Sequence, residues 1–167
     1  AQIVALTTDQ LSNLGTASIA ALSTLQITAL ETSDIATGLT TNQIVALTMA
    51  QIAAMRTAQI ISLSTTQFSV IDTADISGLR TAQISELTTA QFQGLMTAQI
   101  EQLTTLQIKA METRDIAVLT TDNWVALKSS QLAAFISSQV GALGTAALSV
   151  MSTKQISAMT ISQIAVL

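Results

Sequence analysis

Apolar residues recur along this chain at two fixed positions in every eight residues. With Thr7 counted as position 1 and Leu14 as position 8, position 5 is apolar in all 21 units, mostly as Ile, and position 8 is apolar in all 21, mostly as Leu. The step is eight residues throughout, except for one step of nine across residues 36–39. Self-similarity at a short fixed period is typical of solenoid proteins.

The spacing of the apolar positions excludes the two simplest continuous structures. An α-helix advances 3.6 residues per turn, so an eight-residue pattern would precess around it. A strand alternates with a period of two, which the spacing from position 5 to position 8 interrupts once per unit. We therefore expect an all-α solenoid, or superhelix, of very short helices, with one helix and one turn in each of the 21 units. A β-solenoid is the second choice, because Thr, Ile and Gln are tolerated in strands, although six Gly provide few turns.

Helix-capping chemistry supports the short-helix interpretation. In residues 47–52, Thr48 can be the N-cap and Gln51 falls at N3, which is the capping-box arrangement, while Leu47 and Ile52 occupy the hydrophobic-staple positions. Position 1 is Thr, Ser, Asp or Gly in 13 of the 20 units that have one. Where position 1 is unsuited to capping, at Arg56, Arg80 and Met96, we expect the Thr at position 2 to cap instead.

Two polar rows accompany the apolar ones. Position 4 is Gln in 15 units, and position 2 is Thr or Ser in 18 of 20. We expect the Gln row to cap helices and to form a hydrogen-bonded ladder between stacked units, and the Thr row to satisfy helix starts. A ligand-reading row of amides, or a Thr array that binds ice or glycan, is the alternative for each row.

Acidic pairs recur every five units, which gives a super-repeat of about 40 residues. They are the only arrangement that resembles a site, and three equivalent copies argue against a unique catalytic centre. Carboxylates in the first turn of a helix favour its dipole, and that structural role is the expected one. Calcium needs six to eight oxygen ligands, and a pair supplies too few. We predict no metal site, and the weak candidates for calcium are Glu31, Asp34, Asp72, Asp75, Glu112 and Asp115.

The composition excludes several classes of function. The chain has no His and no Cys, so we expect no enzyme, no zinc or haem site and no cofactor. Only six cations are present, at a net charge of −4, which argues against a nucleic-acid partner. Thr, Ser or Gln interrupts every apolar run, so no membrane-spanning helix is expected. The large variants at position 5, which are Phe68, Phe92 and Trp124, and Phe135 at position 8, are expected in the core.

The low content of charged residues suggests that this chain buries surface against copies of itself. The ends of the repeat array suggest that the chain is part of a longer one. Charged residues make up 10% of the chain, against about 25% in ordinary soluble domains. The chain starts in mid-unit and finishes on apolar residues 164–167, without the polar cap that solenoids need. We therefore expect residues 1–167 to be a single repeat array and a fragment of a longer chain.

The unit Leu-(Ser/Thr)-Thr-x-Gln-Ile-x-x-Leu and its variant Glu112-Thr113-Arg114-Asp115-Ile116-Ala117 resemble the octad repeat arrays of giant secreted proteobacterial surface proteins, which are adhesin-like or associated with RTX proteins. This resemblance implies an extracellular or cell-surface filament or adhesin stalk built by self-association. The alternative is a binding array for glycan, mineral or calcium. The frame is also similar to TAL-effector repeats and mesothelin-like superhelices, which carry Pro at the first helical position, where this chain has Thr or Ser.

Overall fold

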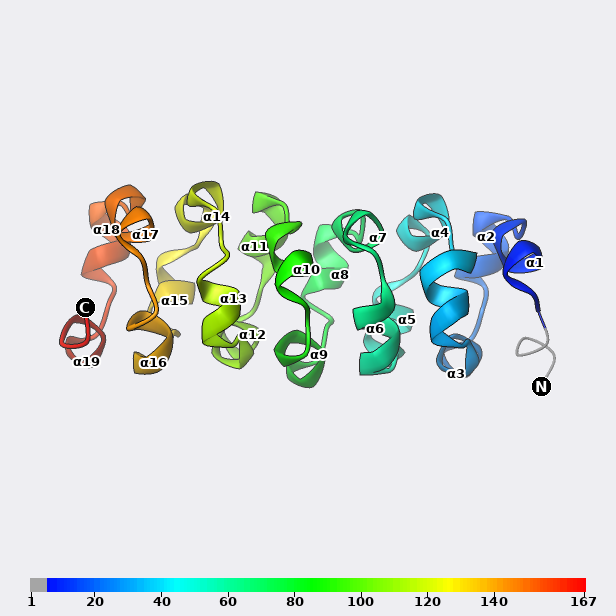
Figure 1. The fold of residues 1–167 in the computed structure, drawn as a ribbon, viewed down its shortest axis with the longest axis horizontal. Helices are drawn as coiled ribbons and strands as arrows, with labels where there is room; N and C mark the ends of the chain where they lie inside the picture. The colour runs from blue at the N-terminus through cyan, green and yellow to red at the C-terminus, as the bar shows by residue number, and fades with distance from the viewer. Residues whose placement is uncertain (1–5) are drawn as a thin grey trace.

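The computed structural model describes residues 6–167, which form a rod of short helices wound around one axis (Figure 1). The helix α1 lies at one end of the rod and α19 at the other. The elements are α1 (Thr8–Ser12), α2 (Thr16–Ala20), α3 (Thr24–Ala29), the π-helical turn η2 (Asp34–Gly38), α4 (Thr41–Val45), α5 (Met49–Ala54), α6 (Thr57–Ser62), α7 (Thr65–Ser69), α8 (Thr73–Ile76), α9 (Thr81–Ser85), α10 (Thr89–Gln93), α11 (Thr97–Gln102), α12 (Thr105–Ala110), α13 (Thr113–Ile116), α14 (Thr121–Ala126), α15 (Ser129–Leu132), α16 (Ser137–Val140), α17 (Thr145–Val150), α18 (Thr153–Ser157) and α19 (Ile161–Ile164).

Each eight-residue unit contains one helix of about a turn and an extended connection to the next. No strand occurs in residues 6–167, so the all-α solenoid is confirmed and the β-solenoid is wrong. The first unit, with Gln2 and Ile3, lies largely outside the described residues. Helices this short are marginal in water by themselves, so their stability has to come from packing between units.

Successive turns of the solenoid contain between three and four units. The helix α8 packs against α5 and α11, which are the third helix before it and the third after it, and this relationship holds along the rod. Hydrogen bonds from position 4 reach one unit further back, to the fourth preceding unit. The sequence pattern left the number of units per turn open, because it describes each unit and not the rotation between units.

The predicted apolar anchors form one continuous core along the axis. Position 5 is fully buried from Leu11 to Val140. The large aromatic residues lie in this core as expected, and the rings of Trp124 and Phe135 pack with centroids 5.9 Å apart. The position-5 anchors from Leu11 to Val140 are therefore covered by neighbouring turns, whereas Ile164 at the C-terminal end is 45% exposed.

The single nine-residue step is absorbed by the π-helical turn η2. The N–H of Leu39 donates to the carbonyl of Asp34 at 3.0 Å, five residues back, so one extra residue fits without shifting the pattern on either side. Gly38 lies where this wider turn meets α1. A Cβ at Gly38 would come within 3.0 Å of Leu11 Cδ2 and 3.3 Å of Thr8 Cα, so a larger residue would displace the preceding turn.

The Thr row and the small residues at position 7 pack against each other between turns. A Cβ built at Gly94, which is at position 7, would lie 3.7 Å from the Cβ of Thr65, which is at position 2 three units earlier. Gly38 faces Thr8 in the same way. The recurrence of small residues at position 7 therefore follows from the close approach of helix starts in the preceding turn.

Candidate functional site

Helix capping follows the predicted frame. In α5, Thr48 Oγ1 accepts the N–H of Gln51 at 3.3 Å, and Gln51 Oε1 accepts the N–H of Thr48 at 2.8 Å. The same reciprocal pair recurs at Thr104 with Gln107. The capping box between positions 1 and 4 is confirmed.

The prediction that position 2 takes over the cap where position 1 is unsuitable is wrong. Helix α6 begins at Thr57 and α9 at Thr81, with Arg56 and Arg80 in the N-cap conformation. In these units only half of the box exists, because the Gln at position 4 still accepts the cap N–H, at 2.8 Å from Arg56 to Gln59. That bond and the packing of the preceding turn hold the helix start without a capping side chain.

The glutamine row forms a ladder along the rod. Gln139 Nε2 donates to the carbonyls of Ile108 and Met111, at 2.8 and 2.7 Å, and these are positions 5 and 8 of the unit four steps back. From Gln43 to Gln163, every glutamine at position 4 is buried and makes such bonds. One amide thus caps its own helix with its oxygen and closes the C-terminal end of another helix with its nitrogen.

The predicted ladder between stacked units is therefore confirmed. The alternative of a ligand-reading row of amides is wrong for Gln43 and the later glutamines, because these amides are buried and engaged at both ends. Gln10 and Gln26 in the first described turn are exposed and make only the capping bond.

Cations at the cap position add bonds between turns that sequence reasoning missed. Arg56 Nη2 donates to the carbonyl of Leu30 at 2.8 Å, and Arg80 Nη2 to that of Met55 at 2.7 Å, each in the unit four steps back. Lys128 Nζ reaches the carbonyl of Glu101 at 2.7 Å. The signal was present in the sequence, since all three cations stand at position 1, where a capping side chain is expected.

One member of each acidic pair takes part in capping, in one of two ways. Asp34 and Asp115 accept the N–H of Glu31 and of Glu112, at 3.0 and 2.9 Å. Asp72 accepts the N–H of Ala74 at 2.9 Å and caps α8. Asp34, Asp72 and Asp115 thus make capping bonds at helix starts.

The three pairs do not come together. They lie on η2, α8 and α13, which pack against other elements and not against one another. Within residues 6–167, no group of three or more acidic side chains is placed to hold a metal ion. The six weak calcium candidates are therefore spread over three places, and each place offers only two carboxylates to a cation.

The charge environment differs between the pairs. Burial raises the pKa of Asp115 to about 6, against the opposing effects of the Glu112 N–H and the Arg114 guanidinium. Burial, and then the charge of Asp72, raises the pKa of Asp75. Arg114 Nε lies 3.1 Å from Glu112 Oε2 and 3.7 Å from Asp115 Oδ1.

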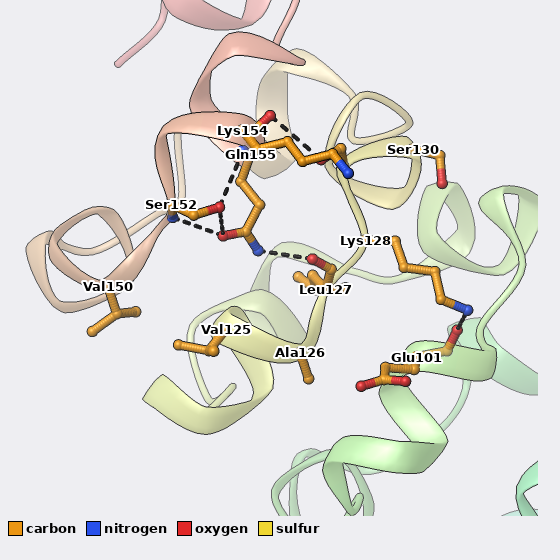
Figure 2. A pocket seen from close by; sticks show the side chains of 11 residues that line it. Glu101, Val125, Ala126, Leu127, Lys128, Ser130, Val150, Ser152, Lys154 and Gln155 are labelled. Carbon is orange, nitrogen blue, oxygen red and sulfur yellow. Dashed lines mark hydrogen bonds between the residues drawn. The ribbon is translucent and has the colours of Figure 1, made fainter.

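An open groove of about 600 Å³ lies beside α14, α15 and α18 (Figure 2). Its lining includes Lys128, Lys154 and Glu101, with Val125 and Val150 on its apolar side. Gln155 crosses it to donate to the carbonyl of Leu127 at 2.7 Å, and Ser129 Oγ donates to the carbonyl of Lys154 at 3.3 Å. These side chains are suited to hydrogen bonding a polar group, and none of them pairs as a nucleophile with a base.

The Thr row winds around the rod, because each turn holds between three and four units. A flat Thr face of the kind that ice binding requires is therefore not formed by consecutive units. None of the described helices has the length and apolar character to span a bilayer.

Comparison with known families resolves what the repeat is. A family model described as the ALTTAQ repeat matches residues 3–37, 27–65, 68–105, 108–145 and 137–167. The chain belongs to the ALTTAQ repeat family. No curated protein and no solved structure matches it.

Three of the five ALTTAQ matches follow the five-unit super-repeat. Matches that start at residues 27, 68 and 108 are 41 and 40 residues apart. The acidic pairs that start at Glu31, Asp72 and Glu112 show the same offsets. One ALTTAQ repeat therefore spans five helix-turn units, which is more than one turn of the solenoid.

Proposed function

We propose that this ALTTAQ array is a non-catalytic structural element outside the cell, either a filament or the stalk of an adhesin-like surface protein. The observation that carries the proposal is the ladder of buried position-4 amides, which joins each turn to the next along the rod. A rod whose turns are joined in this way is suited to holding its ends apart. The resemblance to octad arrays of secreted surface proteins supports an extracellular location.

Exposed apolar side chains support self-association. Leu25 is 80% exposed and Leu106 is 66% exposed, and both stand at position 3 of the unit before an acidic pair. Met96 and Val125 are also more than half exposed. Burial of such side chains is favourable at about 25 cal/mol per Å², so contact between copies of this chain would be stabilising.

Electron microscopy and sedimentation velocity of the 167-residue chain, over a range of concentrations, test the proposal. For the filament, we expect thin fibres or lateral bundles, and L25Q/L106Q should reduce their formation several-fold. Thr24→Ser is the matched control, since it changes an exposed residue next to Leu25 and removes only one methyl group. Rod-shaped monomers at all concentrations would reject the filament and leave the stalk, and compact particles would reject both.

The alternative of a binding array is weakened by the same structure. The Gln row is buried from Gln43 onward, and the described acids do not gather in threes. The surface-exposed Thr side chains and the groove beside Lys128 and Lys154 are the groups left for a glycan. No described feature favours glycan binding over the structural role.

A further inference from the structure

At Asp115 the amide ladder lacks the hydrogen atom that glutamine would donate. Asp115 takes the place of glutamine at position 4 of α13 and is completely buried. Its Oδ2 accepts the N–H of Glu112 at 2.9 Å, which is the capping half of the role of a glutamine. Its Oδ1 has no hydrogen-bond partner among the described residues. A buried carboxylate oxygen without a donor is costly.

Asn123, one unit later, shows what a side chain of the same length reaches from position 4. Its Oδ1 accepts the N–H of Thr120 at 3.1 Å, and its Nδ2 donates to the carbonyl of Leu95 at 3.2 Å, 28 residues back. The same offset from Asp115 leads to the carbonyl of Leu87. Asp115 therefore has an acceptor where Asn123 has a donor.

The surroundings agree with this placement. Leu87 and Arg114, the neighbour of Asp115, line one hollow of about 280 Å³, so the start of α13 lies beside the carbonyl end of α9. Glutamines on either side of this step, Gln107 and Gln131, both close the equivalent bond to position 8, at 2.7 Å. The ladder is intact around the aspartate.

We propose that Asp115 takes up a proton from solvent on Oδ1 and, as a neutral acid, donates a hydrogen bond to the Leu87 carbonyl, so that mild acidification closes this step of the ladder. The array then contains a proton-sensitive step within its amide ladder. The gain on protonation is one buried hydrogen bond and the removal of one buried charge.

Few other charges face Asp115. Its own element supplies Arg114 and Glu112, which pair with each other at 3.1 Å. The helices packed against α13 are α10 and α16, and neither contains a titratable residue. Glu86 lines the hollow with Arg114, and the exposed Lys109 lies in the last turn of α12. Arg114 alone approaches Oδ1, at 3.7 Å, which disfavours a second cation at this oxygen.

The raised pKa of Asp115 determines how stability changes with pH. Burial raises the pKa of Asp115 to about 6, above its ordinary value of 3.8. The folded chain therefore binds this proton more tightly than the unfolded chain does. Stability should fall as the pH rises from about 4 to about 6 and should be lower, but constant with respect to this group, above that range.

The first test is a carbon-13 NMR titration of the aspartate carboxyl carbons in the 167-residue chain, with the Asp115 signal assigned by its loss in D115N. We expect a midpoint well above 4 for Asp115. A midpoint at or below 4 would overturn the proposal. Arg114→Gln should raise the midpoint further, because it removes the nearby positive charge, and an unchanged midpoint would also contradict the geometry.

The second test compares the denaturant midpoint of the wild type and of D115N between pH 5 and pH 7. Asn123 indicates that asparagine fits position 4, so D115N should fold, should be more stable than the wild type at pH 7 and should show a weaker pH dependence, because only the contribution of Asp75 remains. Asp122→Asn removes an exposed charge and should keep the wild-type slope. A slope in D115N as steep as that of the wild type would overturn the proposal. If Na⁺, K⁺ or Ca²⁺ stabilises the wild type but not D115N at pH 7, the ligand of Oδ1 is a cation and not a proton, and the proposal is overturned.

Discussion

Met49 and Gly78 fit together across two turns of the solenoid. Met49 replaces the usual Thr at position 2, and Gly78 stands at position 7 three units later, where Ala is common. A Cβ added at Gly78 would lie 2.5 Å from Met49 Cγ, which is closer than real Cβ contacts. The large residue in one row is thus matched by the smallest residue in the other.

This relationship predicts that Gly78→Ala destabilises the rod by about 1–3 kcal/mol, because overpacking forces neighbouring groups apart. The double variant M49T/G78A should recover most of the loss, since it restores the Thr and Ala pairing found elsewhere. Denaturant unfolding of the two variants and of M49T gives the coupling energy directly.

Gly94→Ala is the matched control for this pair. Gly94 faces Thr65 at an ordinary distance, so a methyl group should fit with little change in stability. Equal losses of stability in G78A and G94A would mean that the contact with Met49 does not determine the destabilisation.

Removal of one ladder amide should lower the free energy of unfolding more than removal of one capping bond does. Gln91 accepts the N–H of Thr88 at 3.1 Å and donates to the carbonyls of Ile60 and Leu63, at 2.9 and 3.0 Å. Gln91→Ala leaves buried carbonyls without a donor, and we expect a loss of about 2–4 kcal/mol in the free energy of unfolding. Gln10→Ala removes a capping bond at an exposed place and should cost about 1 kcal/mol or less.

Gln91→Glu separates the two halves of the glutamine role. The carboxylate keeps the capping acceptor but cannot donate to Ile60 and Leu63 when it is ionised. We expect marked destabilisation at pH 7 and partial recovery near pH 5, as the buried acid becomes protonated. Denaturant midpoints at the two pH values measure this, and a variant as stable as the wild type at pH 7 would show that the donor bonds contribute little.

The pKa of Asp75 should depend on the charge of Asp72. The charge of Asp72 adds to burial in raising the pKa of Asp75. Asp72→Asn keeps a good N-cap residue while removing that charge, so the pKa of Asp75 should fall towards its ordinary value. Because the raised pKa disfavours the ionised form in the folded chain, stability at pH 7 should rise slightly in this variant.

Carbon-13 NMR titration of the Asp75 carboxyl carbon checks this prediction. Asp122→Asn in α14 is the control, and it should leave the titration of Asp75 unchanged. An Asp75 midpoint that does not move in D72N would contradict the assignment of Asp72 as a contributor.

The local features of the fold could be predicted from the sequence because their causes act within six residues. The cap at Thr48, its partner Gln51 and the staple between Leu47 and Ile52 all lie inside one frame. The eight-residue period then predicts short helices buried against one another. The same frame predicted the glutamine ladder, since an amide that caps with its oxygen still has its nitrogen to satisfy.

The features that the sequence did not predict depend on more than one unit. The number of units per turn results from small rotations summed over several units. Arg56 and Arg80 are unsuited to capping when judged within their own unit. Their bonds could not be predicted, because the carbonyls of Leu30 and Met55 that they bind lie about 25 residues away. The donor missing at Asp115 likewise becomes visible only when its counterpart Asn123 is seen to reach the preceding turn.

From Gln43 onward, each glutamine at position 4 bonds its unit to the unit four steps back. Proton NMR of the 167-residue chain, with labelled glutamine side chains, tests this most directly. We expect nuclear Overhauser effects from the Gln91 Nε2 hydrogens to Ile60 and Leu63, and from those of Gln139 to Ile108 and Met111. Contacts only within the same unit, or to units one or two steps away, would contradict it.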